Sequence, residues 1–168
     1  MNVKTILLAL MLLVLNGCAT FEQAMGINQN EGNGYRIDHI EKSYAVTIEY
    51  EHFDFLMERS NREAELSFST PQRPSFDGGQ IVVKIESFSL ESARASNWET
   101  IIFQDGEEIS RTVGRSSTPN FYRSGGQTFW YSSMVVGLDK PVEDGYIDIY
   151  VVSPIQDRRD HFRLFGNN

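Results

Sequence analysis

An alternation of apolar and polar residues with a period of two begins near Tyr35 and constrains the fold more than any other feature. It is clearest in residues 44–51, 64–68 and 81–85, where every second side chain is apolar. Successive side chains of an extended strand point to opposite faces, so this pattern predicts strands with one face in a core. We predict further strands at residues 128–137, 146–152 and 161–165.

The phenylalanines at 53 and 55 fall out of phase with the strand at 44–51. A β-bulge near Glu51-His52 would return both rings to the core side. In all we expect about eight or nine short strands, and no helix apart from one helical turn within residues 89–97. We expect residues 157–161 (DRRDH) to form a charged turn that is solvated, and an anion-binding turn is the alternative.

The dipeptide Asp105-Gly106 predicts a β-hairpin, because both positions of a type I′ turn need a positive φ that Asp and Gly tolerate. Folding about this turn pairs Ile102 with Ile109, Thr100 with Arg111, and Trp98 with Val113.

Clusters of Gly, Pro, Asn and Asp separate the other strands at short intervals, which favours an all-β antiparallel β-sandwich with Greek-key connections. Residues 138–146 (LDKPVEDGY) resemble the tyrosine corner of immunoglobulin-like sandwiches. A jelly roll or a small barrel is the alternative architecture.

The composition sets the size and the charge of this domain. The chain has 168 residues, of which 40% are hydrophobic and 23% charged, as in one folded globular domain. Its formal net charge is −8. That balance argues against a nucleic-acid partner, since binding to phosphates needs a basic surface.

The N-terminus predicts export from the cytoplasm. A short start with Lys4 precedes an unbroken apolar run of ten residues, Ile6 to Leu15. Ten helical residues span about 15 Å, half of the hydrocarbon core of a bilayer. The run is therefore too short for a transmembrane anchor and typical of a signal peptide.

The end of this run, Leu15-Asn16-Gly17-Cys18, resembles the lipobox of bacterial lipoproteins, and Cys18 is the single cysteine of the chain. The resemblance covers residues 1–18 and implies recognition of Leu15, Asn16 and Gly17, cleavage after Gly17 and acylation of Cys18. An ordinary secretory signal is the alternative. Two or three acyl chains give stable membrane attachment, because each buried CH₂ contributes about 0.8 kcal/mol. Ala19 implies export to an outer membrane, where the host has one.

Residues 18–34 then predict a flexible tether, rich in Gly, Asn and Gln, that would span about 20–24 Å as a random coil. A short helix over Glu22–Met25 is the alternative. The predicted organisation is a signal peptide at 1–17, the lipidated tether at 18–34 and one β-sandwich domain at 35–168.

Few residues suggest catalysis. The three histidines lie in no metal-binding motif, and the nearest to one is Glu51-His52-x-Asp54, whose first two side chains would point to opposite faces of a strand. No serine lies in a GxSxG or SxxK pattern. We therefore predict no catalytic residue, no metal and no cofactor.

The segment from Phe121 to Tyr131 is the most suggestive of binding, with five aromatic residues and an arginine around a Gly-Gly turn. Exposed aromatic rings beside polar groups suit the recognition of sugars or peptides. Our candidate ligand-binding residues are Tyr122, Arg123, Trp130 and Tyr131. The alternative is a strand that buries these rings.

The sequence thus predicts a lipid-anchored protein of the cell envelope, at the periplasmic face of the outer membrane or in the plasma membrane of a host without one. Its domain would act as an interaction or structural module with an envelope protein as partner. A glycan- or peptidoglycan-binding module is the first alternative and an envelope hydrolase the second.

Overall fold

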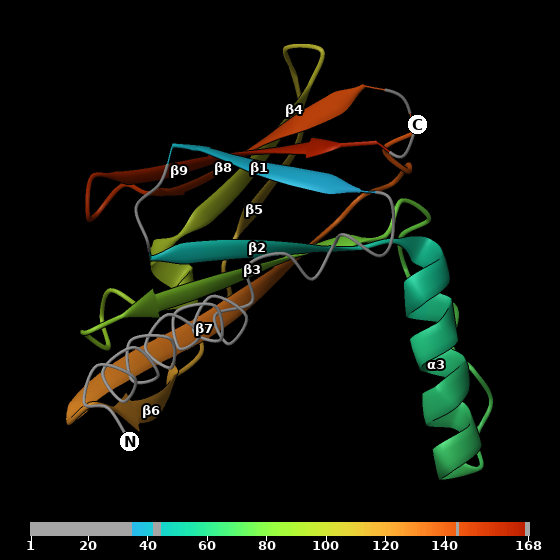
Figure 1. The fold of residues 1–168 in the computed structure, drawn as a ribbon, viewed down its shortest axis with the longest axis horizontal. Helices are drawn as coiled ribbons and strands as arrows, with labels where there is room; N and C mark the ends of the chain where they lie inside the picture. Colours follow the sequence, from blue (N-terminus) through green and yellow to red (C-terminus); the bar gives the residue numbers. More distant parts are fainter. Residues whose placement is uncertain (1–34, 42–44, 144, 167–168) are drawn as a thin grey trace, which may run out of the picture.

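The structure of this chain is a computed structural model that describes residues 35–41, 45–143 and 145–166. These residues form two antiparallel sheets that pack face to face, with one helix beside them (Figure 1). The prediction of an antiparallel β-sandwich is confirmed. The predicted signal peptide, the lipidation site Cys18 and the tether lie outside the described residues.

One sheet has five strands in the spatial order β1-β9-β8-β4-β5, and the other has four in the order β2-β3-β7-β6. The strands of the five-stranded sheet are β1 (Arg36–Glu41), β9 (Arg158–Phe165), β8 (Tyr146–Ser153), β4 (Glu99–Gln104) and β5 (Glu107–Val113). Those of the four-stranded sheet are β2 (Val46–Glu51), β3 (Gln80–Ser87), β7 (Gln127–Gly137) and β6 (Asn120–Ser124). Five of the predicted strands, 44–51, 81–85, 128–137, 146–152 and 161–165, correspond to β2, β3, β7, β8 and the end of β9.

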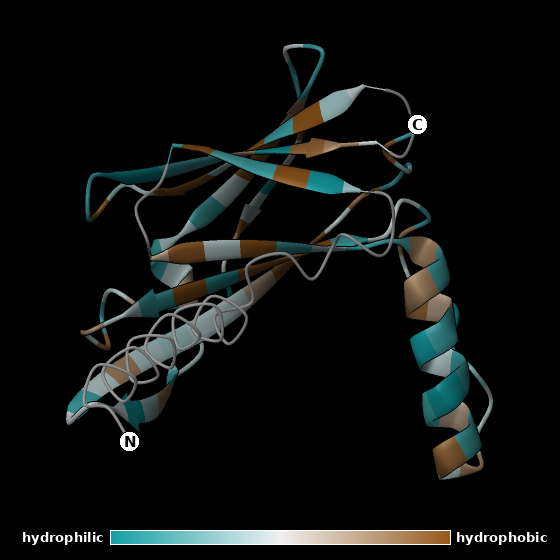
Figure 2. Ribbon diagram, in the orientation of Figure 1, coloured by the Kyte–Doolittle hydropathy of each residue, from teal (hydrophilic) through white to brown (hydrophobic). Residues whose placement is uncertain are grey.

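Apolar side chains from the inner faces of both sheets form one core, and the hydropathy of the strands alternates accordingly (Figure 2). Its fully buried members include Ile81, Val83 and Ile85 of β3 and Ile147, Ile149 and Val151 of β8. Trp98 is the largest fully buried side chain, and its indole N–H donates to the Ser92 carbonyl at 2.8 Å. Trp98 follows the short 3₁₀ helix η1 (Ala95–Asn97), which confirms a helical turn within 89–97.

The predicted hairpin forms between β4 and β5, with positive φ at Asp105 (53°) and Gly106 (83°). Its register is as predicted only next to the turn. An irregularity after Ile102 pairs that residue with Ser110, and Ile109 is exposed. The predicted pairs Ile102–Ile109, Thr100–Arg111 and Trp98–Val113 are therefore wrong by one residue, because a bulge inserts an extra residue into β5.

Residues 53–67 form a helix, α3 (Phe53–Ser67), where we predicted a β-bulge and then a strand at 64–68. Both predictions are wrong. The His52 side chain caps the helix by accepting from the Phe55 N–H at 3.3 Å, and Arg59 makes a bidentate ion pair with Glu51 at the end of β2. The segment is rich in helix-forming Glu, Arg, Leu and Ala, which outweighs an alternation over only five residues.

The expected charged turn at 157–161 is also wrong. Residues 158–161 belong to β9, and only Asp157 stays in the turn, with a positive φ of 49°. Alternation along the strand sends Asp160 to the inner face, where its side chain is fully buried and bonded to the His39 ring at 3.0 Å. The sequence pattern did not predict that Asp160 is buried, because its partner His39 lies on β1, far from Asp160 in the sequence.

Candidate functional site

The aromatic segment forms a regular hairpin of β6 and β7, closed by Gly125 and Gly126 with φ of 57° and 79°. We call this structure the aromatic hairpin. Two positive φ values define a type I′ turn, which glycine adopts without steric cost. Its aromatic residues are Phe121, Tyr122, Phe129, Trp130 and Tyr131.

The strand alternation divides our four candidate residues between two faces. Tyr122 is paired with Phe129, and Tyr131 lies two residues further along the same strand, so all three share the outer face of the four-stranded sheet. Tyr122 and Tyr131 are 41% and 42% exposed. Trp130 and Arg123 lie on the opposite face, so the four residues do not line one common site.

On the outer face the rings contact one another. The rings of Tyr122 and Phe129 stack with their centroids 5.2 Å apart and 9° between their planes, and Phe129 also contacts Phe88. Burial, and then a hydrogen bond to the Glu86 carboxylate, raises the pKa of the Tyr122 hydroxyl. Stacking uses one face of each ring, so the hairpin offers ring edges and outer faces rather than a flat platform.

On the opposite face Phe121 is 58% exposed and contacts Trp130, with the ring centroids 5.2 Å apart. Trp130 is half-buried. The hairpin lies at one end of the sandwich, on the side away from α3 (Figure 1). Both faces of β6 therefore carry a partly exposed aromatic ring.

β6 is also an edge strand, and its composition differs from that of the other edges. The edge strands β1, β2 and β5 carry two or three charged residues each, whereas β6 carries only Arg123. The pairings of β1 and β5 also contain irregularities, and that of β6 with β7 does not. Charges and bulges protect exposed strand edges from pairing with another chain. Among the described strands, β6 is thus the least protected edge.

The hairpin geometry tells which backbone groups of β6 are unpaired. In a two-residue hairpin the closing pair, here Ser124–Gln127, exchanges both hydrogen bonds, and such pairs alternate along the ladder. Tyr122–Phe129 is the next hydrogen-bonded pair. The N–H groups of Phe121 and Arg123 therefore point away from β7, toward the open edge.

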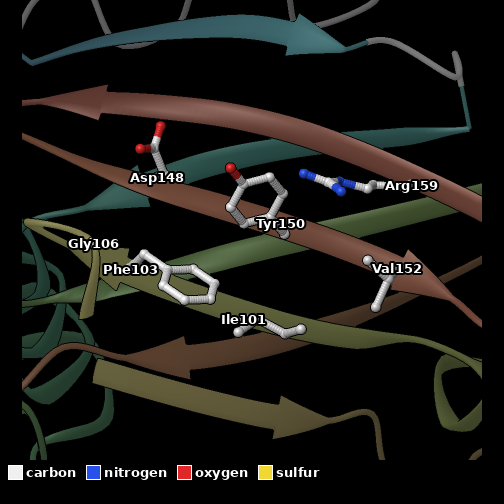
Figure 3. A pocket seen from close by; sticks show the side chains of 7 residues that line it. All are labelled: Ile101, Phe103, Gly106, Asp148, Tyr150, Val152 and Arg159. Carbon is white, nitrogen blue, oxygen red and sulfur yellow. The ribbon is translucent and has the colours of Figure 1, made fainter. Parts of the chain in front are cut away.

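A second candidate surface is a hollow of about 400 Å³ on the outer face of the five-stranded sheet. We call it the outer-face hollow. Figure 3 shows Phe103, Tyr150 and Arg159 side by side on this face. Its lining residues are Ile101, Phe103, Gly106, Asp148, Tyr150, Val152 and Arg159.

The register of three strands brings these residues together. Ile101 of β4 lies opposite Tyr150 of β8, and Phe103 opposite Asp148. Val152 in turn lies opposite Arg159 of β9. Paired residues of neighbouring strands point to the same face, so these rows make a continuous surface. This site was not predicted from the sequence, although Tyr150 is an aromatic residue in the polar phase of the strand at 146–152.

Electrostatic contacts organise the hollow. The Asp148 carboxylate accepts from Arg163 at 2.9 Å and contacts the His161 ring at 2.8 Å. Burial alone would raise the pKa of Asp148, but the hydrogen bonds from Arg163 and His161 outweigh it and hold that pKa below its usual range. The Arg159 guanidinium lies over the Tyr150 ring, 4.4 Å from its centroid.

The described residues contain no group of three or more His, Cys, Asp and Glu side chains placed to hold a metal ion. Glu51 and His52 of the weak metal motif instead anchor and cap α3. His39 bonds to Asp160, and His161 bonds to Asp148 and stacks on Tyr150. Each histidine thus takes part in a contact that supports the fold.

Comparison with known proteins yields no relative: no protein-family model, no curated protein and no solved structure matches this chain. Among the described residues, no helix is long and apolar enough to cross a membrane.

Proposed function

We propose that this chain is a lipid-anchored protein of the cell envelope whose β-sandwich is an interaction module. The lipobox-like Leu15-Asn16-Gly17-Cys18 supports the anchor, and the polar residues that follow it support a tether. We propose the outer membrane as its location, on the basis of Ala19. The partner is an envelope protein that binds at the aromatic hairpin.

One observation carries this function: β6 is an edge strand with an exposed aromatic ring on each face and a single charge. An extended segment that pairs with such an edge gains main-chain hydrogen bonds, and its side chains gain specificity from the surface on either side. Here the N–H groups of Phe121 and Arg123 would bond the partner strand. Phe121 would contact it on one face and Tyr122 on the other.

Photocrosslinking tests the location of the partner. The full-length protein, produced in its native cells, carries benzoylphenylalanine in place of Tyr122 or, as a control, in place of Glu107 on the charged edge strand β5. Both positions are exposed, so the probe itself does not disturb the core. We expect a discrete adduct from position 122 and none from position 107. Equal adducts from both positions would contradict the proposed surface.

The anchor has a separate test, because it does not depend on the partner. Cys18→Ser removes the sulfur to which lipid would attach. We expect this variant to lose labelling by a palmitate analogue and to leave the membrane pellet. A variant that still sediments with membranes would contradict the lipid anchor.

A glycan is the second candidate ligand, and the observation that favours it is the pair of exposed tyrosines beside Glu86 on the outer face. Tyr131→Ala tests it, since Tyr131 lies on β7 and away from the open edge of β6. Loss of peptidoglycan co-sedimentation in this variant would support the glycan. No observation among the described residues favours an envelope hydrolase.

A further inference from the structure

The outer-face hollow lies on the sheet opposite to the aromatic hairpin, so its role is independent of the proposed partner site. We propose that this hollow binds an aromatic carboxylate, with the ring over Ile101 and Val152, beside Tyr150, and the carboxylate at Arg159.

The size and the chemistry of the hollow suit one small aromatic group. Its volume of about 400 Å³ lies in the range of ligand sites, which is about 300–1,000 Å³. Ile101 and Val152 give it an apolar floor. Phe103 and Tyr150 meet edge to face at 85°, with centroids 5.6 Å apart, so they leave an angled aromatic wall for a planar group.

Arg159 is the group that selects an anion. Its ion pair with Glu41 has a distance of 3.6 Å, and both side chains are more than half exposed. The Arg159 guanidinium makes no side-chain hydrogen bond to the residues that the structure describes. Its planar fork of N–H donors matches a carboxylate, and stacking on Tyr150 holds the fork in place at the edge of the hollow.

Asp148 sets the orientation of the ligand. Its carboxylate would repel an anion, but it lies four residues from Val152 along β8, a distance of about 13 Å at 3.3 Å per residue. Val152 is the residue opposite Arg159. Hydrogen bonds from Arg163 and His161 also satisfy the Asp148 carboxylate. The ligand's carboxylate therefore binds at the Arg159 end of the hollow.

Two kinds of molecule carry an aromatic ring close to a carboxylate. One is a free aromatic acid, and the other is the C-terminal residue of a protein that ends in Phe, Tyr or Trp. Two probes distinguish them, 2-naphthoate and the peptide N-acetyl-Ala-Ala-Phe with a free carboxylate. Each has a neutral partner of the same shape, 2-naphthamide and the amidated peptide. Binding is followed by the amide shifts of the full chain with Cys18→Ser, which avoids detergent that would compete for an apolar hollow.

We expect at least one acid to shift the amides of Ile101, Tyr150 and Val152, and to bind at least about tenfold more tightly than its amide. Arg159→Gln should raise the Kd of that acid by about the same factor and leave the amide unchanged. The control is Arg158→Gln, which removes the same charge from the neighbouring residue on the opposite face of β9.

The choice of probe and the choice of variant separate the outcomes. Shifts with naphthoate alone assign a free acid, and shifts with the peptide alone assign a protein C-terminus. Equal binding of acid and amide, an equal loss in Arg158→Gln and Arg159→Gln, shifts confined to the aromatic hairpin, or no binding of either acid would each overturn the proposal.

Discussion

A backbone substitution in β6 tests whether the partner pairs with this edge. Arg123→Pro removes an N–H that points away from β7 and keeps the hydrogen bonds that Tyr122 and Ser124 make within the hairpin. Proline is tolerated on edge strands when its missing N–H faces solvent, and the residue before it favours the extended conformation that Tyr122 already has. Arg123→Thr is the matched control, since it removes the same side chain and retains the N–H.

The expected loss follows from one inter-strand hydrogen bond. A lost bond costs about 1 kcal/mol, and a partner carbonyl that stays buried without a donor adds about 1–2 kcal/mol. Arg123→Pro should therefore weaken the partner's affinity by about 30- to 150-fold relative to Arg123→Thr.

The assay is the yield of the photocrosslinked adduct at position 122, measured at equal protein levels. The urea midpoints of the two variants verify that both are equally folded. Equal adduct yields from folded Arg123→Pro and Arg123→Thr would refute strand pairing at β6.

Three further predictions concern the fold. Phe68 is 98% exposed and holds the left-handed conformation (φ 52°) at the end of α3, so Phe68→Gly should stabilise the domain by about 1 kcal/mol, seen as a Tm higher by roughly 3 °C; a lower Tm would contradict this. Trp98→Phe removes the shorter of the two hydrogen bonds to the Ser92 carbonyl, which keeps the one from Gln156, and leaves a void in the core. Urea unfolding should therefore show a loss of about 2 kcal/mol, and a loss below about 0.5 kcal/mol would contradict that packing. Asp148→Asn should destabilise by about 1–2 kcal/mol at pH 7, since charged hydrogen bonds are lost. Because the folded-state pKa of Asp148 is lowered, its contribution is present above the unfolded pKa of about 4 and is lost as pH falls through the folded pKa. The difference between the urea midpoints of wild type and Asp148→Asn should therefore shrink toward pH 3, and a constant difference would contradict this role.

The strands that the sequence predicted correctly are those with long alternation next to clear turns. Residues 81–85 and 146–152 each send three aliphatic side chains to the core, and no competing period fits them. The Asp105-Gly106 hairpin was found because its turn chemistry is local. The bulge in β5 was not predicted, because a bulge adds one residue to a strand without requiring a particular residue type.

The helix α3 was not predicted because three apolar residues, Ala64, Leu66 and Phe68, alternate with polar ones, as the residues of a half-buried strand do. Only Ala64 of these is buried, since the helix contacts the rest of the domain with little of its surface. The outer-face hollow was missed for a different reason. It depends on the pairing of Ile101 with Tyr150 and of Val152 with Arg159, and the first pair comes from strands far apart in the sequence.

The candidate aromatic residues were found by composition, but their division between two faces depends on the register of β6 and β7. Tyr122 pairs with Phe129, and this places Tyr122 and Tyr131 on one face and Trp130 on the other. A shift of one residue would exchange these faces. The sequence could therefore name the residues of the aromatic hairpin without showing which of them act together.

Hydrogen–deuterium exchange at β6 tests the interaction module most directly. The amides of Phe121 and Arg123 are compared in purified protein and in protein held on the membranes of its native cells, with the amides of β5 as the internal reference. Partner pairing predicts rapid exchange of both amides in the purified protein, and exchange slowed at least about tenfold on membranes, with no change at β5. Equally rapid exchange in the two settings would contradict the proposal that β6 is the site of interaction.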